Sequence, residues 1–233
     1  MMNKMKNVNT KKDKKGNLIL EYDKVNGMYI TMMSSENKLS NTNERHRFIK
    51  KTESIIRKSI QYKAYKKKLM DSGINMCAIL GNITDDKAKI EMHHGPIFTL
   101  WDYVEISLQY LYKNNQPIST FRIADLVLSD HFDDIIQVVM ISESVHKTVH
   151  NPSNNTLNIP LESAWGDLVG YLEKYKGCFD YKHFAKLNDY LGLNRNNMNF
   201  DLFKTKITEW KSIKPPLETP KITDIRRRSD NSI

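Results

Sequence analysis

Apolar residues recur every three or four positions along most of this chain, which is the spacing of one face of an α-helix. Residues that favour helix starts, such as Asn43, Thr99 and Asp180, precede several of these segments. The helices that the pattern predicts span 43–70, 100–113, 119–132, 142–150, 161–175, 180–191 and 199–213. The chain is therefore expected to be mainly helical.

Strict alternation of apolar and polar residues, the period of a β-strand, occurs in only a few short segments. Residues 87–94 alternate in this way, and residues 76–80 form a short apolar run on the other side of a turn, which together predict an antiparallel hairpin. Gly95-Pro96 ends the second strand, because proline cannot extend a strand ladder. Residues 135–141 predict one further strand, and Asn26-Gly27 predicts a small hairpin near the start.

Together these elements predict an α+β protein, mainly helical, that is organised in five successive regions. The regions are a basic arm with the small hairpin (1–42), a basic helix (43–73), a central unit (74–152) with a helical insertion (97–134), a C-terminal helical region (153–214) and a disordered basic tail (215–233).

The composition adds a marked positive charge, since 36 Lys and Arg against 27 Asp and Glu give a net charge of +9. This charge favours a polyanionic partner, and DNA is the partner expected. The helix over 43–70 is strongly basic, and we expect it to contact DNA phosphates without reading base sequence. The residues expected to make these contacts are Arg45, Arg47, Lys50, Lys51, Arg57, Lys58, Lys66 and Lys67.

Neither a membrane-spanning protein nor a disulfide-stabilised protein is expected from this sequence. No apolar run approaches the roughly 18 residues of a membrane span, so no membrane partner is expected. Cys77 and Cys178 lie far apart and have no metal-ligand spacing, which is typical of reduced thiols in the cytoplasm. The sequence does not indicate an oligomeric state.

Four of the seven histidines lie in two short segments, and they carry the candidate chemistry. His93 and His94 end the predicted strand, while His146 and His150 are spaced i, i+4 and share one helix face. Three neutral imidazoles can hold one divalent metal with coordination positions left open. A fourth beside the metal has the pKa of a general base at neutral pH. Adjacent strand residues face opposite ways, so the two strand histidines can share a site only if the strand end is distorted.

These segments resemble the HNH, or ββα-metal, endonuclease motif, whose His-His plus H-x3-H form is shared by colicin-type DNase domains. The match is closest to HNH-type endonucleases of large tailed bacteriophages, and it covers about residues 76–151. The matching segments are His93-His94-Gly95-Pro96, TLWDYVEI, STFRIADLVLSDHFDD and ISESVHKTVHN.

The resemblance implies a ββα-metal core with a long helical insertion and flanking helices. It matches His94 with the general base, and it matches His93, His146 and His150 with the ligands of one divalent metal ion. The ion expected is Mg²⁺ or Mn²⁺, with Zn²⁺ or Ni²⁺ as alternatives. The central Asn of the motif has no counterpart here. Gln137 and Asp134 are the candidates for its role. Only one cysteine of the family's two pairs is kept, so no structural zinc is expected.

The function expected is therefore metal-dependent hydrolysis of DNA phosphodiester bonds, in the host cytoplasm if the chain is phage-encoded. The alternative is a catalytically inactive DNA-binding or virion-associated protein with the same fold. The missing Asn favours this alternative. Cleavage specificity stays open.

Overall fold

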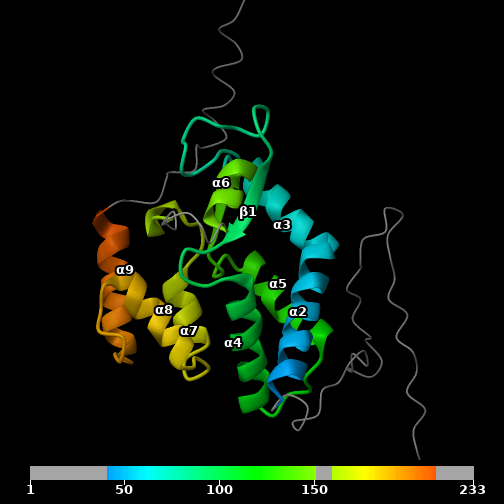
Figure 1. Cartoon of the computed structure of the whole chain (residues 1–233), viewed down its shortest axis with the longest axis vertical. Coiled ribbons are helices and arrows are strands. Elements are labelled where there is room, and N and C mark those ends of the chain that lie inside the picture. Colours follow the sequence, from blue (N-terminus) through cyan, green and yellow to red (C-terminus); the bar gives the residue numbers. More distant parts are fainter. Residues whose placement is uncertain (1–40, 151–158, 214–233) are drawn as a thin grey trace, which may run out of the picture.

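The computed structural model describes residues 41–150 and 159–213, which form eight α-helices, one short 3-10 helix and two strands (Figure 1). The elements in chain order are α2 (Thr42–Lys58), α3 (Ile60–Asp71), β1 (Ile90–His94), α4 (Leu100–Lys113), α5 (Thr120–Phe132), β2 (Val138–Ser142), α6 (Glu143–Val149), η1 (Leu161–Ser163), α7 (Leu168–Lys174), α8 (Tyr181–Leu191) and α9 (Phe200–Ile213). The expected arm with its hairpin and the expected basic tail lie outside the described residues, apart from 41–42 of the arm. The prediction of a mainly helical α+β protein is confirmed.

The basic segment predicted as one helix over 43–70 is two helices, α2 and α3, that meet at Ser59. Ser59 has an extended backbone (ψ 153°), and its hydroxyl accepts a hydrogen bond from the Tyr62 N–H at the start of α3. Serine competes for backbone hydrogen bonds in this way, so it favours a helix start over a helix interior. The resulting bend lets α2 pack on α4 and α5 while α3 packs on α5.

Helices α4 and α5 form the centre of the molecule, and their predicted bounds agree with the structure to within one residue. Thr99 and Asp102 form a reciprocal capping box at the start of α4, and the Ser119 hydroxyl caps α5. Most residues of α4 are buried, including the acidic Asp102 and Glu105. Local cap chemistry and a strong apolar face both favour these helices, which explains why the sequence predicted them well.

The sheet differs from the predicted hairpin over 76–94. β1 pairs antiparallel with β2, with His93 opposite Val139 and His94 opposite Val138. The 76–84 segment forms only an isolated bridge, Met76 with Thr84, and the Ala78 N–H donates to the Met140 carbonyl of β2. β2 is buried at all five positions, so burying its apolar side chains outweighs the shorter loop that a local hairpin would need.

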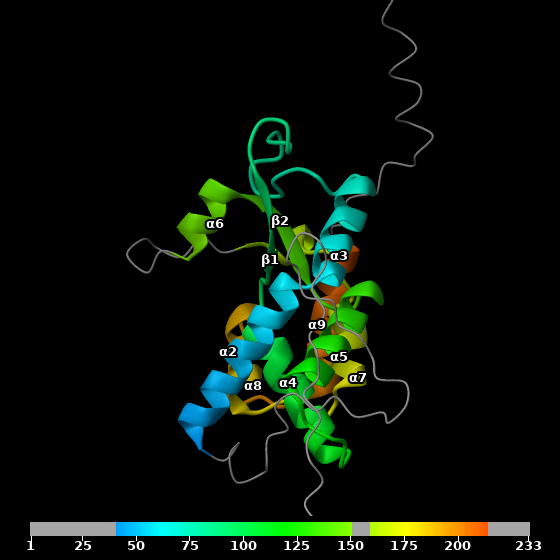
Figure 2. The ribbon, with the colours of Figure 1, turned by 90° about the vertical axis from the view of Figure 1, so that its right-hand side faces the viewer.

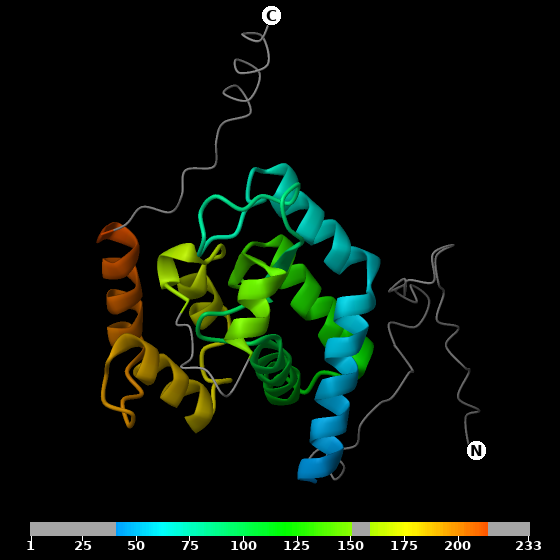
Figure 3. The same ribbon diagram turned by 45° about the horizontal axis from the view of Figure 1, so that its top comes forward.

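The C-terminal region contains a second difference, because the helix predicted over 161–175 is interrupted. η1 is followed by Trp165, which bridges to Val138 of β2, and by Gly166 at φ +114°. A Cβ at Gly166 would lie 2.3 Å from the Ile136 carbonyl oxygen, so the close approach requires glycine. α9 packs against α7, α8 and η1 at one edge of the molecule (Figure 3). No helix among the described residues is long and apolar enough to cross a membrane.

Candidate metal centre

Three of the four predicted histidines come together at the surface of the small sheet. His93 lies on β1, His146 lies on α6, and His150 is the C-cap residue of α6. One ring nitrogen of each lies within 4.8 Å of the others, and the three ring centroids are 4.7–5.1 Å apart. We call these residues the three-histidine cluster.

The local fold explains how the cluster forms. α6 begins directly after β2 and packs on both strands, on the side away from α3 (Figure 2). The Glu143 N–H donates to the Lys89 carbonyl at 3.0 Å, and Val145 is buried, so α6 is fixed against β1. The His150 N–H donates to the His146 carbonyl, which extends the helical spacing to the C-cap and places both rings beside His93.

A carboxylate fixes the orientation and tautomer of His146. Oε2 of Glu91 lies 2.6 Å from Nδ1 of His146, and a hydrogen bond from Lys89 is the main cause that lowers the pKa of Glu91. An ionised carboxylate only accepts, so Nδ1 carries the proton and Nε2 keeps its lone pair. This Nε2 lies 3.1 Å from Nε2 of His150. Carboxylate–histidine pairs of this kind orient metal-binding imidazoles in many proteins.

The protonation states also suit metal binding, since only neutral imidazole ligates a metal. Burial lowers the pKa of His93 to about 4, with smaller contributions from His146 and His150. Burial likewise lowers the pKa of His150. Two ligands at about 2.0–2.1 Å from a tetrahedral ion are roughly 3.3 Å apart, close to the separation of the His146 and His150 nitrogens. His93 is buried and His150 exposed, so the cluster faces outward.

His94 does not join this cluster, contrary to the expectation that a distorted strand end would bring both histidines together. β1 keeps regular pairing through His94, so its side chain leaves on the opposite face to that of His93. Nε2 of His94 lies 3.0 Å from Nε2 of His131, and its ring stacks on Tyr62 at 5.9 Å. Burial keeps its pKa well below the usual value. His94 therefore does not lie beside the three-histidine cluster, and its role as general base stays a prediction that this geometry does not favour.

The His94–His131 pair has a defined proton arrangement. Nδ1 of His131 lies 2.7 Å from the Val127 carbonyl, which only accepts, so Nδ1 carries the proton of His131. Nε2 of the neutral His131 must then accept, and Nε2 of His94 donates. Nδ1 of His94 is left as a buried acceptor without a partner among the described residues. This pair belongs to the core, and the spacing of His131 after Ala124, Val127 and Leu128 is consistent with its place on the buried face of α5.

Gln137 and Asp134, the candidates for the motif's central Asn, have structural contacts. The Gln137 N–H donates to the Tyr103 hydroxyl, and its buried amide has no hydrogen-bond partner in the described part of the chain. Asp134, at φ +54°, accepts hydrogen bonds from the Tyr65 hydroxyl, the Trp165 indole and the Lys68 ammonium. It links α3 to the chain that precedes α7. The residue that does contact the cluster is Glu91, which shares the strand face of His93 through i, i+2 spacing.

The eight basic residues of α2 and α3 that were expected to contact DNA divide into two groups. Arg45 donates to Glu105 at 2.6 Å and is only 29% exposed, and Lys66 donates to the Ile90 carbonyl at 2.6 Å. Both side chains make contacts within the fold, so we expect them to contribute less to phosphate contacts than the exposed residues do. The other six are exposed, although several have acidic or other partners on the surface. They are Arg47, Lys50, Lys51, Arg57, Lys58 and Lys67.

The fold and cluster together describe a mainly helical α+β protein with an open group of three imidazoles at its surface. The chain belongs to the bacteriophage G278-like virion protein family, whose model matches residues 1–213. Searches of curated proteins and of solved structures gave no match. The predicted membership of the HNH endonuclease family is therefore wrong, because the family match spans most of the chain and is to virion proteins. Membership points to the virion rather than the host cytoplasm.

Proposed function

We propose that this virion protein binds one divalent transition-metal ion through His93, His146 and His150. The observation that carries the proposal is the convergence of three ring nitrogens within 4.8 Å, with Glu91 orienting one of them. Burying the polar ring of His93 beside two further imidazoles has a free-energy cost, and a shared ligand offsets that cost.

The donor set favours some metals over others. Imidazole nitrogens suit Zn²⁺, Ni²⁺ and Cu²⁺, whereas Mg²⁺ prefers oxygen ligands and keeps several waters. The cluster has no carboxylate ligand, since Glu91 is hydrogen-bonded to His146. Among the ions expected from the sequence, Zn²⁺ and Ni²⁺ are therefore favoured over Mg²⁺ and Mn²⁺.

The first candidate role is that of a DNA-binding virion component in which the metal centre is not catalytic. The burial of His94 favours this role, because the group expected to take the proton from water lies on the far side of β1. The net charge of +9 and the exposed lysines of α2 and α3 supply the attraction to a phosphate backbone.

The second candidate role is hydrolysis of phosphodiester bonds in nucleic acid. It is favoured by the openness of the cluster, because three protein ligands leave a position for water, as in catalytic rather than structural zinc sites. A bound Zn²⁺ lowers the pKa of its water to about 7, so a separate general base is not required. After burial and the neighbouring histidines, the charge of Arg57 adds to the lowering of the pKa of His93 and His150, so Arg57 is the cation we assign to the phosphate.

The test combines metal binding, DNA retention and cleavage of supercoiled plasmid, each with Zn²⁺, Ni²⁺, Mn²⁺ and Mg²⁺ in turn. The parent is compared with His146→Ala and with His46→Ala, a control at an exposed histidine outside the cluster. Loss of one metal equivalent per chain in His146→Ala and not in His46→Ala supports the site. Nicking lost with it supports hydrolysis, and salt-sensitive retention without nicking supports the DNA-binding role. Equal metal binding by parent and His146→Ala rejects the site.

A further inference from the structure

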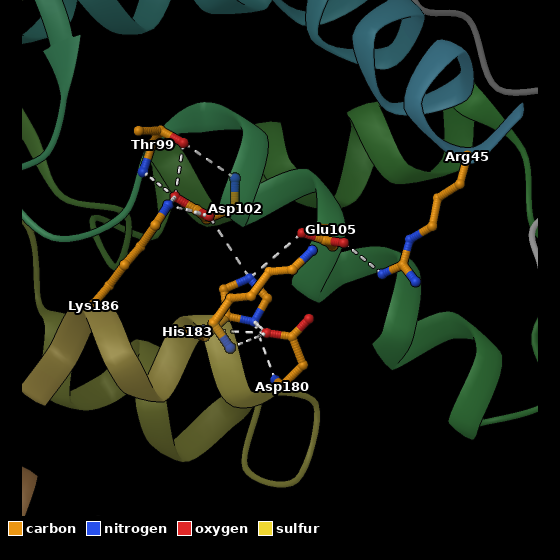
Figure 4. Close-up of polar contacts among 8 residues, drawn as sticks. Arg45, Thr99, Asp102, Glu105, Asp180, His183 and Lys186 are labelled. Carbon is orange, nitrogen blue, oxygen red and sulfur yellow. Dashed lines mark hydrogen bonds and ion pairs between the residues drawn. The ribbon is translucent and has the colours of Figure 1, made fainter. Parts of the chain in front are cut away.

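A second group of potential ligands lies in the core, between α4 and α8 (Figure 4). Asp102 and Glu105 come from successive turns of α4, and His183 comes from the first turn of α8. Their exposed fractions are 3%, 6% and 0%, and one ligand atom of each lies within 4.8 Å of the others. None of these residues belongs to the three-histidine cluster.

The decisive feature is Nε2 of His183, which is buried and has no hydrogen-bond partner in the described residues. It points between two carboxylates and lies 3.8 Å from Oδ1 of Asp102 and 3.8 Å from Oε2 of Glu105. These distances are too long for a hydrogen bond. Two ligands at about 2.1 Å from a tetrahedral ion are roughly 3.4 Å apart. The nitrogen and the two oxygens are therefore a few tenths of an ångström farther apart than ligands of one ion, and a small movement of these side chains would place all three around a shared cation.

The other ring nitrogen of His183 is held by Asp180. Nδ1 lies 2.8 Å from Oδ1 of Asp180 and 3.1 Å from the Asp180 backbone nitrogen, within the capping box of α8. Nδ1 accepts the Asp180 backbone N–H, so the neutral ring of the metal-free protein carries its proton on Nε2. An ion bound at Nε2 would shift that proton to Nδ1, where Oδ1 of Asp180 accepts it, as in carboxylate–histidine–metal arrangements. Burial lowers the pKa of His183 against the opposing effect of three carboxylates, which favours the neutral ring.

The charges around Asp102, Glu105 and His183 are short of one positive charge. Three carboxylates (Asp102, Glu105 and Asp180) face two cations, since Arg45 pairs with Glu105 and Lys186 pairs with both oxygens of Asp102 at 2.6–2.7 Å. With neutral His183 one negative charge is unbalanced. If Lys186 left and a divalent ion entered, the ion and Arg45 would balance the three carboxylates.

Lys186 also lies where an ion would pass from solvent to the buried carboxylates. Its side chain is 42% exposed, and it lines a cavity of about 620 Å³ together with Thr99, Ile159 and Asp189. The ammonium group can therefore move from Asp102 into this cavity and open a path from solvent to the buried oxygens.

We propose that Asp102, Glu105 and His183 form a second, buried divalent-metal site, in which the Lys186 ammonium takes the place of the ion in the metal-free protein. One imidazole and two carboxylates suit Zn²⁺ or Mn²⁺. Because the ligands come from α4 and α8, the bound ion joins the central helices to the C-terminal region. The site shares no residue with the three-histidine cluster, so a result for or against this site does not decide the function proposed above.

The test starts from a variant that lacks the first cluster, His93→Ala/His146→Ala/His150→Ala. The protein is stripped with a chelator, dialysed against Zn²⁺ or Mn²⁺, and its bound metal is counted by mass spectrometry. We expect one equivalent per chain, which is lost when Glu105→Gln is added and kept with the surface control Glu44→Gln. No bound equivalent, or one that survives Glu105→Gln, overturns the proposal. If protonation of His183 neutralises the unbalanced negative charge instead, the protein binds no metal equivalent, which is the first of these results.

A second variant covers the case in which Glu105→Gln does not fold, as judged by circular dichroism. Lys186→Met removes the competing ammonium and keeps the apolar part of the side chain. In the same background it is expected to bind Zn²⁺ more tightly by calorimetry. Unchanged or weaker binding contradicts the proposed exchange between Lys186 and the ion.

Discussion

Replacing Glu91 with glutamine removes one charge and almost no volume beside the three-histidine cluster. The bond between Oε2 of Glu91 and Nδ1 of His146 is 2.6 Å long, and both side chains are only about a quarter exposed (23% and 24%). A charge-assisted bond of this kind is stronger than its neutral counterpart and makes the imidazole a better ligand. Glutamine keeps an acceptor but loses the charge, and its amide can also present N–H to Nδ1.

The size of the effect follows from the position of Glu91. Loss of such a partner lowers metal affinity by about 10- to 100-fold in known sites. Lys89 already shares the charge of Glu91, so we expect the middle of this range, about 30-fold or roughly 2 kcal/mol. Calorimetry with Zn²⁺ against a competing chelator measures this change in affinity.

The matched control is Glu143→Gln. Glu143 also pairs with Lys89, at 3.6 Å, and with Lys147, but its ion pairs include no histidine of the cluster. We expect this control to bind Zn²⁺ as the parent does. If Glu91→Gln retained the affinity of the parent, or if both variants lost it equally, the assigned role of Glu91 would be wrong.

Three further outcomes are expected. Gly95→Ala should weaken Zn²⁺ binding several-fold, because the new Cβ would lie 3.1 Å from Nε2 of His93; unchanged affinity contradicts this. Burial lowers the pKa of His131 and of His93 to about 4 from 6.5, and that of His94 well below its usual value, so unfolding takes up protons, and denaturant titrations should show stability falling by about 3 kcal/mol or more between pH 6.5 and 4; a flat profile refutes it. Lys50→Ala should lower the salt slope of DNA binding by about one, whereas Arg45→Ala should leave it unchanged; equal effects contradict the division between them.

The sequence predicted those parts of the fold that depend on local signals. α4, α5, α8 and α9 begin within one residue of their predicted starts, because cap residues such as Thr99 and Asp180 act on their own N-terminal turn. The i, i+4 spacing of His146 and His150 likewise predicted their shared face. These helix starts and this shared face are determined by residues that are neighbours along the chain.

Long-range choices could not be predicted in this way. β1 pairs with β2, more than forty residues away, and this choice depends on total burial rather than on the local alternation over 76–94. The position of His94 depends on His131, which nothing in the sequence linked to it. Glu91 carries a local signal, because its i, i+2 spacing places it on the strand face of His93, although it is not one of the motif residues that the resemblance matches.

Crystals grown with Zn²⁺ give the most direct measurement, through an anomalous difference map at the zinc absorption edge. The account predicts a peak about 2.0–2.1 Å from one ring nitrogen each of His93, His146 and His150. It also predicts that this peak disappears in crystals of His146→Ala. A map without a peak at these three rings, in protein that is folded and exposed to Zn²⁺, would contradict the proposed metal centre.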